Sequence, residues 1–194
     1  MTTKCYLIAV IGDVNLKPGT KKYLLAENLG QNLIDNGYHL LTGVLDGITE
    51  AVANGARHSL FYEDETIVSF YTGNDPKEVS PFMEVWISKC LNLACDTIVS
   101  TADAVIAIGG GAGTLHDITN AWTWNRLIIA YRVDGLSGKI ADKKINLRTR
   151  YPDIPEDRVY GVSSAYEAIE CLTQKIDTYT HRHKTTQMQE TRLS

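Results

Sequence analysis

Short apolar runs alternate along this chain with stretches in which apolar residues recur every three or four positions. Runs of strand length occupy residues 5–11, 38–42, 67–70, 102–108, 127–131 and 159–162. The first run is continuously apolar, which is typical of a strand that is covered on both faces in a parallel sheet. After the first run, Leu25, Leu29 and Leu33 follow helical spacing, and Ile48 and Val52 do so after the second.

Strands that alternate with helices at this interval predict right-handed crossovers and a central, mostly parallel sheet. The predicted fold class is therefore α/β, in a Rossmann-like three-layer arrangement. Ligands of such sheets bind beyond the carboxyl ends of the strands, where the strand order reverses. We expect four loops to open on this edge: Gly12, residues 43–47, residues 71–81 and residues 109–114.

Local signals mark two helix boundaries. Gly37 follows Asn36 and is expected to close the first helix. Ser164 and Glu167 have the spacing of a capping box and predict the start of the last helix. Residues 82–100 show mixed helical patterning, whereas the polar residues 134–156 lack clear periodicity and predict no element.

The strongest candidate chemistry lies at the end of the 102–108 run, in Gly109, Gly110, Gly111 and Gly113. Glycines admit positive φ and let a ligand approach the main chain without meeting a Cβ. The amides that open the following helix have no intrahelical partner and favour a phosphate or carboxylate, and Thr114 adds a hydroxyl donor. The stretch therefore predicts an anion-binding loop. The alternative is a tight turn that merely fits a crowded crossover.

Two common phosphate loops do not match this stretch. The dinucleotide fingerprint G-x-G-x-x-G fails because its third glycine would fall on Thr114. The nucleoside-triphosphate loop requires Gly-Lys-Ser/Thr, whereas Gly113 is followed by Thr114 and Leu115. We therefore expect neither NAD held in the usual way nor ATP with its magnesium.

The composition favours one domain. The 194 residues are 44% hydrophobic, enough for one sizeable core. We expect residues 1–178 to form that domain and the polar residues 179–194 to be a disordered tail. A net charge of -4 argues against a nucleic-acid partner. Because no apolar run reaches the ~18 residues of a membrane span and no signal peptide is evident, we expect a cytoplasmic protein without a membrane partner.

The sequence predicts no metal site. Cys90 and Cys95 form an isolated C-x4-C pair without flanking histidines, which is weak evidence for zinc. We expect all four cysteines to be reduced thiols. His181 and His183 could hold a metal, although a solvated basic tail is the simpler interpretation.

Two separated motifs carry a family resemblance. The first spans residues 42–56, and the second comprises residues 100–103 followed by residues 109–117. In this order they resemble the LONELY GUY (LOG)/SLOG superfamily, the lysine decarboxylase-like Rossmann proteins. The similarity is closest to its small bacterial nucleotide-binding branch, which includes molybdenum cofactor carrier proteins, and it covers residues 4–134.

The resemblance implies a Rossmann-like fold, a homodimer and a small phosphorylated ligand. The superfamily's enzymes cleave the N-glycosidic bond of nucleoside 5'-monophosphates, whereas other members bind nucleotides or pterin cofactors without known catalysis. The ligand implied here is accordingly a nucleoside monophosphate or a pterin-type cofactor. The implied ligand-binding residues are Gly12, Asp13, Thr42, Gly43, Gly47, Gly109, Gly110, Gly111, Gly113 and Thr114.

The catalytic positions depart from those of the enzymes. Asp117 stands where they have a glutamate, and Ala94 or Cys95, depending on a one-residue gap, replaces their arginine. Val44 and Leu45 replace consecutive glycines in the first motif. Neither alanine nor cysteine can grip a phosphate at two points as a guanidinium does. The leading hypothesis is therefore a ligand-binding protein with little or no catalysis.

Two other functions stay open. A phosphoribohydrolase would use Asp117 as its acid/base residue, with Lys89 or Arg126 supplying the missing positive charge. Asp117 could equally be a first-turn acid that the helix dipole favours by ~0.3–1 kcal/mol. A protein-interaction module would keep a vestigial loop and expose aromatic residues, although core packing or a dimer interface explains these more simply. The residues concerned are Tyr71, Phe82, Trp86, Trp122 and Trp124.

Overall fold

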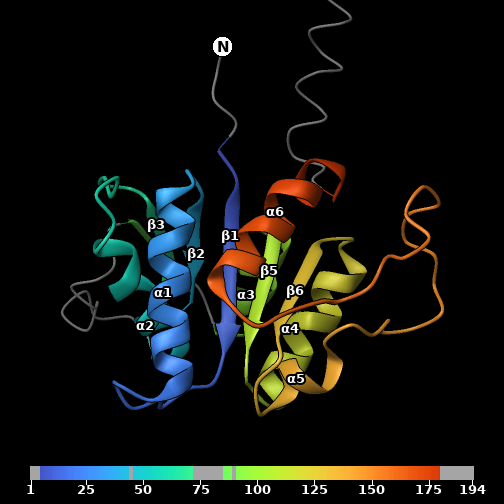
Figure 1. Ribbon diagram of the computed structural model, residues 1–194, viewed down its shortest axis with the longest axis horizontal. Coiled ribbons are helices and arrows are strands. Elements are labelled where there is room, and N and C mark those ends of the chain that lie inside the picture. Colours follow the sequence, from blue (N-terminus) through green and yellow to red (C-terminus); the bar gives the residue numbers. More distant parts are fainter. Residues whose placement is uncertain (1–4, 44–45, 72–84, 89–90, 180–194) are drawn as a thin grey trace, which may run out of the picture.

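The computed structural model describes residues 5–43, 46–71, 85–88 and 91–179, with the backbone alone described at residues 71, 85–88 and 91–95. Within these residues, seven strands form one parallel sheet in the order β4-β3-β2-β1-β5-β6-β7 (Figure 1). The strands are β1 (Leu7–Gly12), β2 (His39–Thr42), β3 (Ile67–Tyr71), β4 (Val85–Ser88), β5 (Ala104–Ile108), β6 (Leu127–Tyr131) and β7 (Tyr160–Val162). The predicted α/β fold class is confirmed.

Helices cover both faces of this sheet. On one face lie α1 (Lys21–Asp35), α2 (Ile48–Arg57) and α6 (Ala165–Tyr179), which are in front in Figure 1. On the other lie α3 (Leu91–Thr101), α4 (Ala112–Thr123) and α5 (Leu136–Ile140). In β1, Ile8 and Val10 lie in the core on the face covered by α1, α2 and α6, and Ala9 and Ile11 lie in the core on the opposite face. Because both faces of the strand are buried, its sequence is apolar throughout.

The strand order reverses beside β1. From β1 the chain builds outward through β2, β3 and β4, then returns to place β5 on the other side of β1. Gly12 at the end of β1 pairs with Ile108 at the end of β5. The loops that follow these two strands therefore open side by side at the carboxyl edge, which is the predicted location of the site.

Both predicted helix boundaries are confirmed. Gly37 has φ of 75° and its amide donates to the Ile34 carbonyl at 2.9 Å, which ends α1. At the start of α6, the Glu167 amide donates to Ser164 Oγ at 3.2 Å, and Glu167 Oε2 accepts from the Ser163 amide at 2.8 Å. The Glu167 carboxylate thus bonds the residue before the one expected in an ideal capping box.

The structure differs from the prediction in three segments. The stretch 82–100, predicted as mixed helical, contains the four-residue edge strand β4 before α3. The segment 134–156 contains α5, for which no element was predicted. Tyr179, assigned to the tail, is a buried residue of α6, whereas residues 180–194 and the predicted loop beyond Tyr71 lie outside the described residues.

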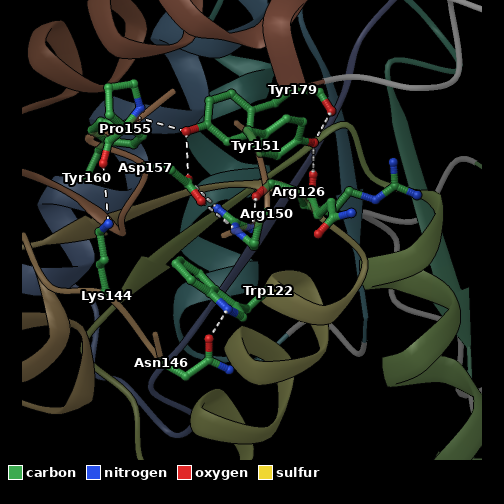
Figure 2. A network of polar contacts seen from close by, with 11 residues as sticks. Trp122, Arg126, Lys144, Asn146, Arg150, Tyr151, Pro155, Asp157, Tyr160 and Tyr179 are labelled. Carbon is green, nitrogen blue, oxygen red and sulfur yellow. Dashed lines mark hydrogen bonds and ion pairs between the residues drawn. The ribbon is translucent and has the colours of Figure 1, made fainter. Parts of the chain in front are cut away.

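A buried polar network closes the amino edge of the sheet, opposite the site (Figure 2). The Arg150 side chain, fully buried, donates from Nε and Nη2 to the two oxygens of Asp157 at 2.8 and 2.6 Å. Its guanidinium lies 3.8 Å from the Trp122 ring centroid, and Tyr179 Oη donates to Asp157 Oδ1 at 2.7 Å. Nη1 donates to the carbonyl of Arg126, the residue just before β6. The network ties the irregular segment after α5 to α4 and α6.

We expect Arg150→Ala to destabilise the fold by about 3–5 kcal/mol, because it leaves the buried Asp157 carboxylate without its charge partner. Arg150→Lys should recover little of this loss, since an ammonium cannot make the paired bonds or stack as a planar group does on Trp122. Urea unfolding measures both. Arg148→Ala, an exposed neighbour, is the matched control, and equal stability of the Arg148 and Arg150 variants would contradict the assignment.

Candidate functional site

The first loop, which follows β1, packs against the end of β5 and against the end of the second loop, which follows β2. A Cβ on Gly12 would lie 2.1 Å from the Ile108 carbonyl oxygen, so only glycine permits this approach. The Asp13 carbonyl accepts from the Ile48 amide at 2.9 Å, which ties the start of α2 to the first loop. Gly47 has φ of 57°, and a Cβ there would lie 2.3 Å from the Asp13 carbonyl oxygen. Gly12 and Gly47 therefore serve the packing of the loops against one another.

The first two glycines after β5 are bonded within the protein. The Gly109 amide donates to Ser137 Oγ, and the Gly110 amide donates to Asp13 Oδ1, both at 2.8 Å. Their carbonyl oxygens accept from the Ser137 and Leu136 amides of α5 at 2.9 Å. Both glycines have positive φ, 70° and 86°. These four bonds hold the loop in place and leave neither amide for a ligand in this arrangement.

The next residues present their amides outward. The first hydrogen bond that closes a turn of α4 runs from the Leu115 amide to the Gly111 carbonyl at 3.0 Å. Among the described residues, the amides of Gly111, Ala112, Gly113 and Thr114 have no partner. A Cβ on Gly111 or Gly113 would meet no atom of the described residues within 4 Å, and residues 111–113 are exposed. An anion can therefore approach the positive end of α4 here.

Three further residues predicted to bind the ligand are Thr114, Thr42 and Gly43. The buried Thr114 directs its hydroxyl back toward the Gly12 carbonyl, 3.4 Å away, so its amide is the group turned to the helix end. Thr42 is fully buried, and its hydroxyl bonds Ser69 Oγ at 2.7 Å. Gly43 is half-buried beside the Ile98 side chain.

Asp117 lies one turn beyond Gly113, on the same face of α4. Burial raises the pKa of its carboxyl above the usual value; the neighbouring His116 lowers it, and the Asp96 carboxylate adds to the increase. Asp96 Oδ1 accepts from Asn120 Nδ2 at 2.6 Å and lies 3.3 Å from His116 Nε2. Asp117 itself has no hydrogen bond or ion pair with the described residues. It is a half-buried carboxylate that forms no ion pair with the part of the chain that the structure describes.

Two residues near the glycine loop were missed from the sequence. Ser137 Oγ accepts from the Gly109 amide and donates to the Tyr131 carbonyl at 2.8 Å. Lys22 Nζ lies 2.5 Å from Asp13 Oδ2, so it orients the carboxylate that holds the Gly110 amide. Ser137 lies in a segment without periodicity, and Lys22 resembles any polar residue of a helix. Neither position carries a local signal.

Neither of the two residues suggested to supply positive charge for a hydrolase is found at this edge among the described residues. Arg126 precedes β6 at the amino edge, where its Nη2 donates to the Ser100 carbonyl at 2.5 Å. Lys89 lies outside the described residues, as do the side chains of Ala94 and Cys95. The guanidinium of Arg126 therefore lies at the edge of the sheet opposite the glycine loop.

The structure divides the aromatic residues that could form an exposed face. Trp122 is buried, 1% exposed, whereas Trp124 is 54% exposed. The side chains of Tyr71, Phe82 and Trp86 lie outside the described residues. Trp124 is therefore the single residue of the predicted aromatic face that is exposed among the described side chains.

Several sequence expectations concern metals, thiols and membranes. Cys5 and Cys171 are free thiols, and burial raises the pKa of Cys171 to about 11. The described residues contain no group of three or more potential metal ligands. Every helix found among them is too short or too polar to cross a bilayer.

Comparison with known proteins places this geometry among related folds. A protein of Archaeoglobus fulgidus without an assigned function is 29% identical over 119 residues, which cover 61% of this chain and 74% of that protein. The molybdenum cofactor binding protein from Rippkaea orientalis has a TM-score of 0.70 at 24% identity, over 90% of this chain and 99% of its own.

The molybdenum cofactor carrier protein from Chlamydomonas reinhardtii has a TM-score of 0.69 at 17% identity, over 88% of this chain and 98% of its own. At these identities the two structures show a shared fold. The family model described as the SLOG cluster4 family matches residues 5–159, from just before β1 to just before β7. The chain therefore belongs to the SLOG cluster4 family.

Proposed function

We propose that this protein binds the phosphate group of a nucleotide or a pterin-type cofactor at the N-terminus of α4, with little or no catalysis. The observation that carries the proposal is the run of amides at residues 111–114 without partners among the described residues. Unpaired amides at a helix start satisfy a phosphate oxygen directly, and the helix dipole favours its negative charge.

The division of the glycines supports this proposal. Gly109 and Gly110 are bonded to Ser137 and Asp13, so they give the loop a fixed shape. Gly111 and Gly113 face open space instead. A rigid loop followed by open amides is preorganised for an anion, because little conformational freedom is lost on binding.

The ligand class rests on the relatives. The structures from R. orientalis and C. reinhardtii are named for binding or carrying the molybdenum cofactor, and they share this fold across nearly their whole length. A pterin-type ligand that carries a phosphate fits the open amides as well as a nucleoside monophosphate does. The proposed partner is therefore a small phosphorylated molecule, and we propose that two copies of the chain form a homodimer.

We expect Gly113→Val and Gly111→Val to abolish stabilisation by phosphorylated ligands while leaving the fold intact. The added side chains enter the open space that the phosphate needs, and neither position has the positive φ that would strain a branched residue. Thermal shift with a panel of nucleoside monophosphates and a phosphorylated pterin measures the effect. Binding that is unchanged in both variants would contradict the phosphate position.

The matched control for this experiment is Thr123→Val, an exposed position at the opposite end of the same helix. It places a valine on α4 by exchanging a hydroxyl for a methyl group far from the amides, so ligand stabilisation should persist. Gly110→Val should instead damage the loop, because its φ is 86° and its Cβ would lie 2.1 Å from Thr114 Oγ1.

One observation favours a phosphoribohydrolase as the second candidate. The raised pKa of Asp117 is suited to a residue that delivers a proton to a leaving base. Against it, Asp117 is shorter than glutamate, and misplacing a catalytic group by about 1 Å can reduce the rate ~10²-fold. Ligand binding without catalysis is therefore the better supported function.

Release of free base from nucleoside 5'-monophosphates tests this candidate. We expect none above background from the wild-type chain. Base release that Asp117→Asn abolishes, and that the exposed Asp153→Asn does not alter, would establish the hydrolase and replace the binding function.

The pKa of Asp117 also predicts a dependence of stability on pH. Because the folded-state pKa is raised, the ionised carboxylate destabilises the fold at neutral pH, and this penalty disappears as the pH falls below the ordinary value near 3.8. Asp117→Asn should therefore raise Tm at pH 7, with a gain that shrinks toward pH 4. A Tm lower than wild type at pH 7 would contradict this interpretation.

A further inference from the structure

A cavity lies at the carboxyl edge, on the β6 side of the glycine loop. Its volume is about 640 Å³, within the ~300–1,000 Å³ range of small-molecule pockets. It lies between the first turn of α1 and the segment that runs from the end of β6 through α5. The charged residues that line it are Lys21, Lys22, Arg132, Asp134, Lys139 and Asp142. We call this hollow the lysine cavity.

The charges of the lysine cavity do not cancel. Arg132 Nη2 lies 2.8 Å from Asp142 Oδ2, so these two residues neutralise each other. Lys21 and Lys139, both exposed, have no ion-pair partner among the described residues, and Asp134 is the remaining acid of the lining. A chain with an overall net charge of -4 thus gathers four cations and two acids around one hollow.

The placement of two of these lysines is unfavourable for stability. Lys21 and Lys22 open α1, whose first turn contains no acidic residue. Cations at this end of a helix oppose its dipole. Lys22 is compensated by Asp13, 2.5 Å away, whereas Lys21 is not compensated by any described residue. An unfavourable charge that faces a cavity is expected where a ligand supplies the missing counter-charge.

The lysine cavity also touches the glycine loop. Lys22 lines the cavity and holds Asp13, whose other oxygen accepts from the Gly110 amide. Gly135 lines it as well, and a Cβ there would lie 2.9 Å from the Gly109 Cα. The cavity and the amides of α4 are therefore separate places on one edge, with the glycine loop between them.

We infer that the lysine cavity is a second anion-binding site, which takes a phosphate or carboxylate group through Lys21 and Lys139. This site goes beyond the phosphate position at α4, and it rests on the proposed function only where the anion belongs to the ligand held there. The acidic group comes either from a second part of the ligand held at α4 or from a separate small anion. Arg132 and Lys22, already paired, shape the walls rather than supply the free charge.

Calorimetric titration with inorganic pyrophosphate at low ionic strength tests the inference. We expect measurable binding to the wild-type chain and a loss of affinity of about tenfold or more in Lys21→Ala/Lys139→Ala, because two charge-assisted contacts are removed. Gly113→Val should retain this component of binding. If Gly113→Val abolishes all binding and the lysine variant binds normally, the anion occupies α4 alone and the second site is refuted.

The control is Lys17→Ala/Lys144→Ala, which removes the same charge at exposed positions outside the cavity lining. Equal weakening in the control would show a general effect of net charge and overturn the site, as would the absence of pyrophosphate binding to the wild type. Circular dichroism should show that the lysine variant is folded.

A comparison of AMP with ADP separates the two sources of the anion. If one ligand reaches both sites, ADP should bind more tightly than AMP, and the lysine variant should lose that difference. If the anion is separate, pyrophosphate should still bind to wild-type protein that already holds AMP. The lysine variant should bind AMP but lose this additional equivalent of pyrophosphate. Either pattern supports the site, and a lysine variant indistinguishable from wild type in both experiments refutes it.

Discussion

The arrangement of this protein's carboxyl edge depends on how closely β1 and β5 approach where both strands end. Gly12 lies against the Ile108 carbonyl at a distance that excludes any Cβ. The close approach carries Asp13 over the loop that follows β5, where its carboxylate accepts from the Gly110 amide. The first loop, the glycine loop and the start of α2 are therefore one connected unit, and α4 begins at a defined point beside it.

This connection explains why the glycines differ in role. Those nearest the strands permit positive φ or close backbone contacts, and their amides are bonded by Ser137 and Asp13. Those at the start of α4 face open space. A phosphate site needs both properties, because unsatisfied amides bind an anion well only when the backbone that carries them is held still.

The buried polar network and the proposed ligand site lie at opposite edges of the sheet. The Arg150, Asp157 and Tyr179 network is buried at the amino edge and has its charges paired (Figure 2). At the carboxyl edge, Asp117 and Lys21 lack charge partners among the described residues. Functional sites commonly retain such locally unfavourable groups, because a ligand interacts with what the protein leaves unsatisfied. The paired network can supply stability without affecting the binding edge.

Local patterns were sufficient for most of the architecture. Short, mostly apolar runs identified six of the strands, because burial on both faces leaves few polar positions within them. Gly37 and the pair Ser164 and Glu167 marked helix ends through contacts within a few residues. The edge strand β4, four residues long, was missed, since so short a run carries little periodic signal. The position of α5 was also missed.

What the sequence alone determined is the α/β class, the order of the elements other than β4 and α5, and a glycine-rich strand-to-helix turn at the carboxyl edge. Only the tertiary structure decided which glycine amides are open, because Asp13 and Ser137 reach Gly110 and Gly109 from positions 97 and 28 residues away. It likewise brought Lys21 and Lys139 to one cavity from separate elements. Hydrogen bonds and charges between distant segments depend on how the layers pack, and no local pattern records that.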